Sequence, residues 1–255
     1  MRHFVLPDVQ AKQGDNFEFL TAIGNFVVDK KPEVVVCIGD FADLPSLSSY
    51  DVGKKSFEGR RYTADVDATV QAMTALLKPV AIFNFKAIRN KEKQYRPRLV
   101  LTLGNHENRI NRAIENDAKL EGLLSVNDLE YQEFGWEVFP FLDVVVIDGV
   151  AYSHYFSTGT MGRPATTAQA QLNKKHQSCV AGHQQGLQIA MATRADGRRL
   201  TSVIAGSCYQ HDEDYMGPQG NKHWRGCLML HDVNEGEFNL EPLPLDYIVR
   251  NYGAT

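Results

Sequence analysis

Several short apolar runs in this chain end directly in a glycine or proline that is followed by a polar residue. Runs of this length, rich in β-branched residues, predict buried β-strands. Ligands of layered α/β folds gather in the loops at the carboxyl ends of strands, so we expect these polar side chains to meet there. Four junctions have this form: Leu6 to Pro7-Asp8, Ile38 to Gly39-Asp40, Leu103 to Gly104-Asn105-His106, and Ala181 to Gly182-His183.

The spacing of apolar residues changes along the chain. Segments with helical spacing at 16–28 and 64–77 separate the early strands, whereas the second half is rich in strands. We expect an α/β layered sandwich, in which two mixed β-sheets are flanked by helices and the active site lies at the carboxyl ends of strands. The predicted strands are residues 3–6, 34–38, 99–103, 144–147, 179–181, 189–193 and 202–205.

Composition and charge are those of an ordinary globular chain. The 255 residues carry a net charge of -4 and are 43% hydrophobic, which suits one domain over residues 1–255. The four cysteines form no CxxC pair, so free thiols fit better than a disulfide or zinc framework. The N-terminus lacks the apolar run of a signal peptide, and no membrane span is evident. We therefore expect a cytoplasmic protein without a membrane partner, and the sequence leaves its oligomeric state open.

The longest interval between polar junctions, residues 44–98, is expected to be a helical insertion. It is predicted to hold two helices that are broken near Pro79. Its last part fits either a solvated helix face or an edge that meets a polyanion. This part sets six basic residues against the single acid Glu92: Lys86, Arg89, Lys91, Lys93, Arg96 and Arg98.

Carboxylate, amide and imidazole side chains at strand ends are typical of a two-metal hydrolase. Two divalent ions held about 3.5–4 Å apart generate a nucleophile from water and stabilise charge on a phosphoryl group. Such a centre needs a bridging carboxylate and further Asp, Asn and His ligands from several strand ends. The chain offers these residue types in order along its sequence.

Five segments resemble the signature blocks of calcineurin-like metallophosphoesterases. Each block is weak alone, but five in the family's order, most of them at strand ends, are specific. The resemblance implies a metal-binding hydrolase that acts on phosphoric ester bonds with a binuclear metal centre. The blocks are Asp8-Val9-Gln10, Gly39-Asp40-Phe41-Ala42-Asp43, Gly104-Asn105-His106-Glu107, His154 in AYSHYF, and Gly182-His183-Gln184-Gln185.

The resemblance assigns one complete metal site. Asp40 corresponds to the carboxylate that bridges the two ions. Asn105, His154 and His183 correspond to the other ligands of the first ion, with no departure from the family pattern.

The second ion would take Asp8, Gln10 and Gln185, and both glutamines stand where the family usually has histidine. A glutamine binds through a neutral carbonyl oxygen, which is a harder ligand than imidazole nitrogen. We expect an unequal pair of sites that favours Mn²⁺, with Mg²⁺, iron, Zn²⁺ or Ni²⁺ as alternatives. A related branch of the family that acts on ADP-ribose-like diphosphates with manganese also has Gln in the first block.

The resemblance also implies the catalytic residues. A water that bridges the two ions would attack phosphorus, His106 would protonate the leaving oxygen, and Asp43 would orient the imidazole. The extended block GNHExR places Arg109 where protein phosphatases have an arginine that grips phosphate. Arg109 is therefore either a substrate ligand or an exposed residue at the start of a helix. The blocks DVQA and GDFADL depart from the protein-phosphatase pattern, so that specific class is not expected.

A late segment rich in Tyr, Trp, Gly and His, residues 207–225, is a candidate lining for the substrate groove. His223 and Arg225 could hold a base or a sugar phosphate there. The alternative is a surface loop around a packed Trp224. The loop 157–163, which follows His154, is a second candidate for substrate contact.

Three functions remain open at this stage. The first is a phosphodiesterase or nuclease-like enzyme on a nucleotide or nucleic-acid substrate. The second is a phosphomonoesterase, which a terminal phosphate gripped by Arg109 would favour. The third is a non-catalytic binding scaffold of the same fold, which the two glutamines would favour and the retained His106 and Asp43 disfavour.

Overall fold

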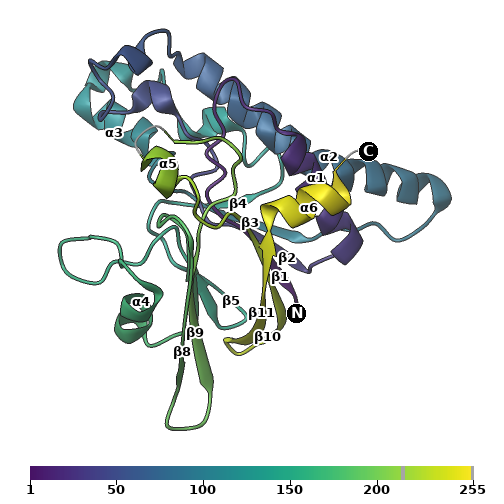
Figure 1. Cartoon of the computed structure of the whole chain (residues 1–255). Coiled ribbons are helices and arrows are strands. Elements are labelled where there is room, and N and C mark those ends of the chain that lie inside the picture. Colours follow the sequence, from purple (N-terminus) through teal and green to yellow (C-terminus); the bar gives the residue numbers. More distant parts are fainter. Residues whose placement is uncertain (214–215, 254–255) are drawn as a thin grey trace.

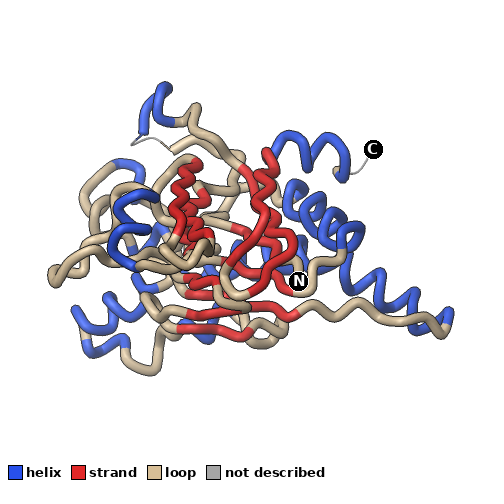
Figure 2. The backbone as a smooth tube through the Cα atoms, turned by 90° about the horizontal axis from the view of Figure 1, so that it is seen from below, coloured by secondary structure: helices blue, strands red, loops and turns tan. Residues whose placement is uncertain are grey.

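The computed structural model describes residues 1–213 and 216–253, and it has the layered architecture shown in Figures 1 and 2. The strands are β1 (His3–Leu6), β2 (Val34–Cys37), β3 (Arg98–Thr102), β4 (Glu137–Phe139), β5 (Val145–Ile147), β6 (Val150–Tyr152), β7 (Cys179–Ala181), β8 (Leu187–Thr193), β9 (Arg199–Ala205), β10 (Gly226–Asn234) and β11 (Glu237–Pro244). The helices are α1 (Glu18–Lys30), α2 (Tyr62–Asn90), α3 (Asn108–Asn116), α4 (Ala168–Lys175), α5 (Gly217–Gly220) and α6 (Leu245–Tyr252), with short 3₁₀ turns η1 (Pro45–Leu47), η2 (Lys55–Phe57), η3 (Ala118–Leu120) and η4 (Val126–Leu129).

Two mixed sheets form the centre of the molecule. The first has the order β11-β10-β1-β2-β3-β4, in which β1 to β4 run parallel and β10 is antiparallel to β1. The second has the order β5-β6-β7-β9-β8, in which β6, β7 and β9 run parallel. The predicted α/β sandwich of two mixed sheets with flanking helices is confirmed. All seven predicted strands are present, and their ends differ from the expected ones by at most three residues.

Successive side chains along the strands of the first sheet point into two different hydrophobic cores, one on each face of the sheet. Phe4 and Leu6 point into the cluster formed with α1, α2 and α6, whereas Val5 points into the cluster between the sheets. On the outer face of the second sheet, Leu172 of α4 packs with Ile204 of β9. Strands β1 and β2 are buried on both faces, so their sequences are continuous apolar runs rather than alternating polar and apolar residues.

Parallel pairing brings the carboxyl ends of the key strands together. Leu6 pairs with Cys37 and Cys37 with Leu101, so the loops after β1, β2 and β3 leave the first sheet side by side. Tyr152 pairs with Val180, so the loops after β6 and β7 leave the second sheet in the same way.

The segment between β2 and β3 contains η1, η2 and one long helix. The expected break near Pro79 is wrong, because α2 continues through Pro79 to Asn90. A proline deprives the carbonyl four residues earlier of its helical donor. Here that carbonyl is Ala75 O, and it accepts a hydrogen bond from the Thr21 hydroxyl of α1 at 3.3 Å. Contact with α1 therefore compensates for the missing bond.

Helix α2 is also long and apolar enough to cross a membrane, judged by length and composition alone. Only 33% of its most apolar window is buried within the molecule. Its first half packs along α1, and its second half projects from the body (Figure 1). Core helices of soluble proteins meet the same criterion, so length and composition do not distinguish the two environments.

A close approach between α1 and α2 yields a test of this packing. A Cβ at Gly24 would overlap the carbonyl oxygen of Leu76 and meet Pro79 Cγ at 2.8 Å. Gly24→Ala should therefore lower the free energy of unfolding by about 1–3 kcal/mol, although helix propensity alone would raise it by about 0.5–1 kcal/mol. Urea denaturation measures the change, and the exposed Lys30→Ala in the same helix serves as the control. Stabilisation by Gly24→Ala would contradict this packing.

Candidate metal centre

The residues predicted to bind metal lie in loops from both sheets. Asp8 follows β1, Asp40 follows β2 and Asn105 follows β3 in the first sheet. His154 follows β6 and His183 follows β7 in the second sheet. The centre therefore lies where the carboxyl ends of the two sheets face each other, and each sheet contributes ligands.

Four side chains converge as the ligands of one ion would. Asn105 Oδ1 lies 2.9 Å from His154 Nε2 and 2.7 Å from His183 Nδ1. Asp40 Oδ2 lies 3.3 Å from His154 Nε2. Two ligand atoms bound at about 2.1 Å to a common ion lie roughly 3.0–3.4 Å apart. The 3.3 Å distance lies in this range and the two shorter distances lie just below it, so an ion would bind after a small outward shift of Asn105 or the imidazoles. The mixed N/O donor set fits a divalent transition metal.

His154 is held in the tautomer that a metal ligand needs. Its Nδ1 lies 2.9 Å from the carbonyl oxygen of Ile38, which can only accept a hydrogen bond. The Nδ1 proton is thus fixed, and Nε2, which faces Asp40 and Asn105, is the nitrogen that a metal ion would bind. A backbone carbonyl behind a ligating histidine is a common way to orient the ring and raise its basicity.

Charges in this site are balanced around the buried carboxylate of Asp40. Burial raises the pKa of Asp40, but the nearby imidazoles of His106 and His154 outweigh it and hold the pKa below its usual value. Burial lowers the pKa of His154, yet the charge of Asp40 and its hydrogen bond raise it to about 9. Burial and the neighbouring His154 lower the pKa of His183 to about 4. Asp40 therefore attracts positive charge to this point.

The second predicted set lies beside the first. Both carboxylate oxygens of Asp8 accept the N–H of His183, at 3.2 and 3.1 Å. The N–H of Gln10 donates to the carbonyl oxygen of Asp40 at 2.8 Å. Gln185 Oε1 accepts a hydrogen bond from the Tyr209 hydroxyl at 3.2 Å. These contacts place Asp8 and Gln10 next to the first site, and Gln185 lies two residues after His183 in the same loop. Joint binding of a second ion by the three residues stays a prediction.

Asp8 is itself in an environment that disfavours its negative charge. Burial is the main cause, the charge of Asp40 adds to it, and the pKa of Asp8 rises to about 7. Two buried carboxylates close together ionise fully only when a cation lies between or beside them. This electrostatic cost is the physical reason to expect a cation on the Asp8 side of Asp40.

Tight turns bring these ligands off their strands. Gln10, Asp40 and His183 all have positive φ angles, of 49°, 50° and 66°. Non-glycine residues rarely adopt this conformation, and it is often found at functional sites. A Cβ at Gly104 would overlap Asp40 Oδ1, and one at Gly182 would overlap Asp8 Oδ1. Glycine is needed in the third and last blocks because a carboxylate lies directly against the backbone.

The predicted catalytic pair is assembled beside Asp40. His106 Nδ1 lies 2.9 Å from Asp43 Oδ1, close enough for an ion pair, although the angle is outside that of a formed hydrogen bond. His106 Nε2 lies 3.7 Å from Asp40 Oδ2. Burial lowers the pKa of His106, but the charges of Asp40 and Asp43 raise it above its usual value. The imidazole is thus set between two carboxylates at the rim of the centre.

Arg109 is directed inward rather than toward solvent. Its Nη1 donates to the carbonyl oxygen of Asp43 at 2.6 Å, and its Nη2 lies 3.0 Å from His106 Nε2. Its side chain is only 15% exposed. The predicted alternative of an exposed helix-start residue is therefore wrong, whereas phosphate binding by Arg109 stays a prediction.

Glu107 has a structural role that the sequence did not reveal. Its fully buried carboxylate accepts hydrogen bonds from the N–H groups of Asp40 at 3.0 Å, Ala42 at 3.0 Å and Gly104 at 2.8 Å. It also accepts one from the Tyr131 hydroxyl at 3.1 Å. One side chain thus ties together the loops after β2 and β3. The sequence places Glu107 in the third signature block, but that resemblance does not indicate that its carboxylate binds backbone groups of neighbouring loops.

The late loop borders the centre, with residues 214 and 215 lying outside the described part. Glu213 Oε1 accepts a hydrogen bond from Lys12 Nζ at 2.8 Å, and the same Nζ lies 4.0 Å from Asp43 Oδ2. The ring of Tyr209 stacks on His211 with centroids 4.4 Å apart. The Arg225 guanidinium lies 4.8 Å from the Tyr209 centroid. The segment is a structured wall next to the predicted catalytic pair.

The two predicted substrate ligands in this loop have partners within it. His223 Nε2 lies 2.8 Å from Ser207 Oγ, and its Nδ1 lies 2.8 Å from the carbonyl oxygen of Gly220. Arg225 Nη2 donates to Asp212 Oδ1 at 3.1 Å. These contacts order the loop, so substrate binding by either residue would require an exchange of partners. The substrate roles of His223 and Arg225 stay predictions.

Comparison with known proteins gives a limited result. No protein-family model matches the sequence, and no curated protein matches it. Among solved structures, the chain is similar to Yfce, a phosphoesterase from E. coli, with 12% sequence identity and a TM-score of 0.36. The similarity covers 95% of this chain and 100% of that chain.

The role of Glu107 generates a stability prediction. In Glu107→Gln, one carboxylate oxygen becomes an NH₂ group that faces hydrogen-bond donors, so at least one buried backbone N–H loses its acceptor. We expect the free energy of unfolding to fall by about 2–4 kcal/mol, measured by urea denaturation with metal present and with chelator. Glu133→Gln, at an exposed glutamate, should change it by less than about 0.5 kcal/mol. Equal effects of the two substitutions would contradict the role assigned to Glu107.

Proposed function

We propose that this protein is a metallophosphoesterase of the calcineurin-like type, a hydrolase that uses two divalent ions. The observation that carries the proposal is the convergence of Asp40, Asn105, His154 and His183 with His106 at the rim. The candidate ligand atoms lie 2.7–3.3 Å apart, and the His106 imidazole lies 3.7 Å from the Asp40 carboxylate. A metal site and a proton donor would therefore be adjacent. A scaffold for binding alone would not need that imidazole.

The residues of the centre divide between two ions. The first ion would be held by Asn105, His154 and His183. The second ion would be held by Asp8, Gln10 and Gln185. Asp40 would bind both ions. The ions would polarise the phosphoryl oxygens and lower the pKa of water to about 7. Hard oxygen donors dominate the second set, so Mn²⁺ is the ion we expect, ahead of Mg²⁺ and of softer metals.

His106 would supply a proton to the leaving oxygen. Asp43 lies 2.9 Å from Nδ1 and would orient the ring, and Nε2 is the nitrogen that faces Asp40 and the reacting group. Asp40 and Asp43 together favour the protonated ring. Proton donation by a positioned side chain contributes roughly 10²–10⁴-fold to such reactions.

Arg109 connects this proton donor to the substrate. Its Nη2 lies 3.0 Å from His106 Nε2. Once the imidazole is protonated, an N–H of Arg109 and the Nε2–H of His106 would face each other without an acceptor between them. A phosphoryl oxygen that accepts from Nη2 would relieve this conflict and leave Nε2–H free for the leaving group. Binding of the phosphate by Arg109 and charging of His106 would therefore favour each other.

A nucleotide or nucleic-acid phosphodiester is the substrate that we propose. The late loop supports this choice, since Tyr209 contacts Gln185 and Lys12 lies between Glu213 and Asp43 at the centre. The basic residues between Lys86 and Arg98 give no such support. They precede β3 at its amino end, roughly 15 Å along the strand from the metal ligands.

The test is an activity assay on metal-stripped protein to which Mn²⁺, Mg²⁺, Zn²⁺ or Ni²⁺ is returned. Bis-p-nitrophenyl phosphate reports diesterase activity and p-nitrophenyl phosphate reports monoesterase activity. We expect diester cleavage that is greatest with Mn²⁺ and that falls at least about 100-fold in His106→Ala. His231→Ala, at a partly exposed histidine on β10, is the matched control and should retain full activity.

The other outcomes separate the alternatives. A preference for the monoester would favour a phosphomonoesterase in which Arg109 grips a terminal phosphate. Metal binding by calorimetry without hydrolysis of either substrate would favour the binding scaffold. Activity that survives His106→Ala would contradict the proposed proton donor.

A further inference from the structure

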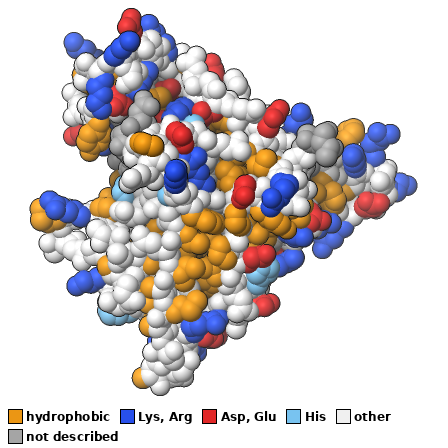
Figure 3. Space-filling model, viewed as in Figure 1, with side chains coloured by type: hydrophobic (Ala, Val, Ile, Leu, Met, Phe, Trp, Pro, Cys, Tyr) orange, Lys and Arg blue, Asp and Glu red, His pale blue; other side chains and the backbone are white. Residues whose placement is uncertain are grey.

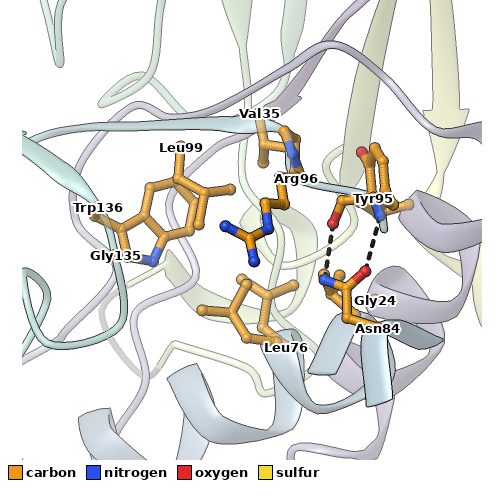
Figure 4. A pocket seen from close by; sticks show the side chains of 13 residues that line it. Gly24, Val35, Leu76, Asn84, Tyr95, Arg96, Leu99, Gly135 and Trp136 are labelled. Atoms are coloured by element: carbon orange, nitrogen blue, oxygen red, sulfur yellow. Dashed lines mark hydrogen bonds between the residues drawn. The ribbon is translucent and has the colours of Figure 1, made fainter. Parts of the chain in front are cut away.

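A cavity lies on the helix side of the first sheet, away from the candidate metal ligands. Its volume is about 430 Å³, within the range of roughly 300–1,000 Å³ that is usual for small-molecule sites. Val35 and Leu99 line it from the sheet, and Leu76 lines it from α2 (Figure 4). Trp136, just before β4, forms another wall. The lining is mostly aliphatic or aromatic.

The polar groups of this lining already have partners. The Asn84 side chain donates to the carbonyl oxygen of Tyr95 and accepts the Tyr95 N–H, both at 2.8 Å (Figure 4). Trp136 Nε1 donates to Met73 Sδ at 3.1 Å. A ligand in this cavity would therefore find apolar surface and almost no free hydrogen-bonding group.

Arg96 is the exception. It is the charged residue of the lining, and its guanidinium extends over the cavity toward Trp136 and Leu76 (Figure 4). Its contacts are with the amide oxygen of Gln94, at 3.2 and 2.8 Å. Within residues 1–213 and 216–253 it forms no ion pair, whereas Arg98, two residues later, forms one with Glu137 at 2.7 Å.

We propose that this cavity binds the hydrocarbon chain of an anionic amphiphile and that Arg96 binds the head group. The apolar walls suit the chain, and the guanidinium at the opening suits a carboxylate or phosphate. A nucleotide fits poorly, because its base would leave polar edges against an aliphatic wall. The proposal does not depend on the hydrolase activity, because the cavity is at the amino end of β3 and the metal centre is at its carboxyl end.

The projecting half of α2 indicates two sources for such a ligand. Ile82, Phe85 and Ile88 are 45%, 61% and 59% exposed there, and Lys86 and Arg89 lie among them. Lys and Arg side chains gather at this end of the molecule (Figure 3). Apolar and basic side chains together suit the surface of an anionic bilayer. The amphiphile could thus be free in solution or part of a lipid layer.

Calorimetric titration of the full-length, metal-loaded protein with hexanoate, octanoate and decanoate tests the proposal. We expect the affinity to rise about three- to fourfold for each added methylene until the cavity is filled. Val80→Trp, which places an indole in the cavity, should abolish binding. Arg96→Gln should weaken octanoate binding at least tenfold and leave 1-octanol binding unchanged, because the alcohol has no charge. Arg96→Lys should restore part of the loss.

Arg61→Gln, the same change at an exposed arginine just before α2, is the control and should leave the binding of both ligands unaffected. Flotation with phosphatidylglycerol and phosphatidylcholine vesicles separates the sources. If the protein floats only with the anionic vesicles, and Val80→Trp abolishes this association, the ligand is part of a lipid layer. If the protein associates with neither kind of vesicle, the ligand is a free amphiphile. No decanoate binding at millimolar concentration would overturn the proposal. Binding that is unchanged in both Val80→Trp and Arg96→Gln would overturn it as well.

Discussion

A buried carboxylate at Asp40 is the constraint on which the candidate site depends. The residue is 2% exposed, and its backbone has a left-handed conformation with φ 50°. Burial of a charge is tolerated only when it is paired or hydrogen-bonded. Here the N–H of His106 donates to Oδ1 at 2.8 Å and His154 lies 3.3 Å from Oδ2, while Glu107 accepts the Asp40 N–H. The loops after β2, β3 and β6 are thus arranged around one negative charge.

The sequence predicted those parts of the site that depend on strand ends. Apolar runs that stop at a polar residue located β1, β2, β3 and β7, and parallel pairing then brought Asp8, Asp40, Asn105 and His183 together. Glu107 could not be found this way, because its role comes from donors on three separate loops. The continuation of α2 through Pro79 could not be predicted either, because the compensating hydrogen bond comes from Thr21 on another helix. Strands β4, β6, β10 and β11 were not predicted. Strands β4 and β6 have only three residues each, and polar and apolar residues mix along β11. Strand β10 does contain an apolar run, CLML, of the kind that marked the predicted strands.

The parallel strands of the first sheet have different chemistry at their two ends. At the carboxyl ends the loops present carboxylates, amides and imidazoles that face the second sheet. At the amino end of β3, the segment before Arg98 and the helices α1 and α2 enclose apolar space with Arg96 at its opening. The same strands therefore support a polar centre and a separate apolar cavity, because helices cover one face of the sheet and the second sheet covers the other.

Anomalous diffraction from crystals grown with Mn²⁺ would test the central claim most directly. We predict a peak within about 2.3 Å of Asp40 Oδ2, Asn105 Oδ1, His154 Nε2 and His183 Nδ1. We also predict a second, weaker peak about 3.5–4 Å away, between Asp40 and the side chains of Asp8, Gln10 and Gln185. A map with no peak at the first position, at saturating Mn²⁺ and neutral pH, would contradict the claim that these residues form a metal centre.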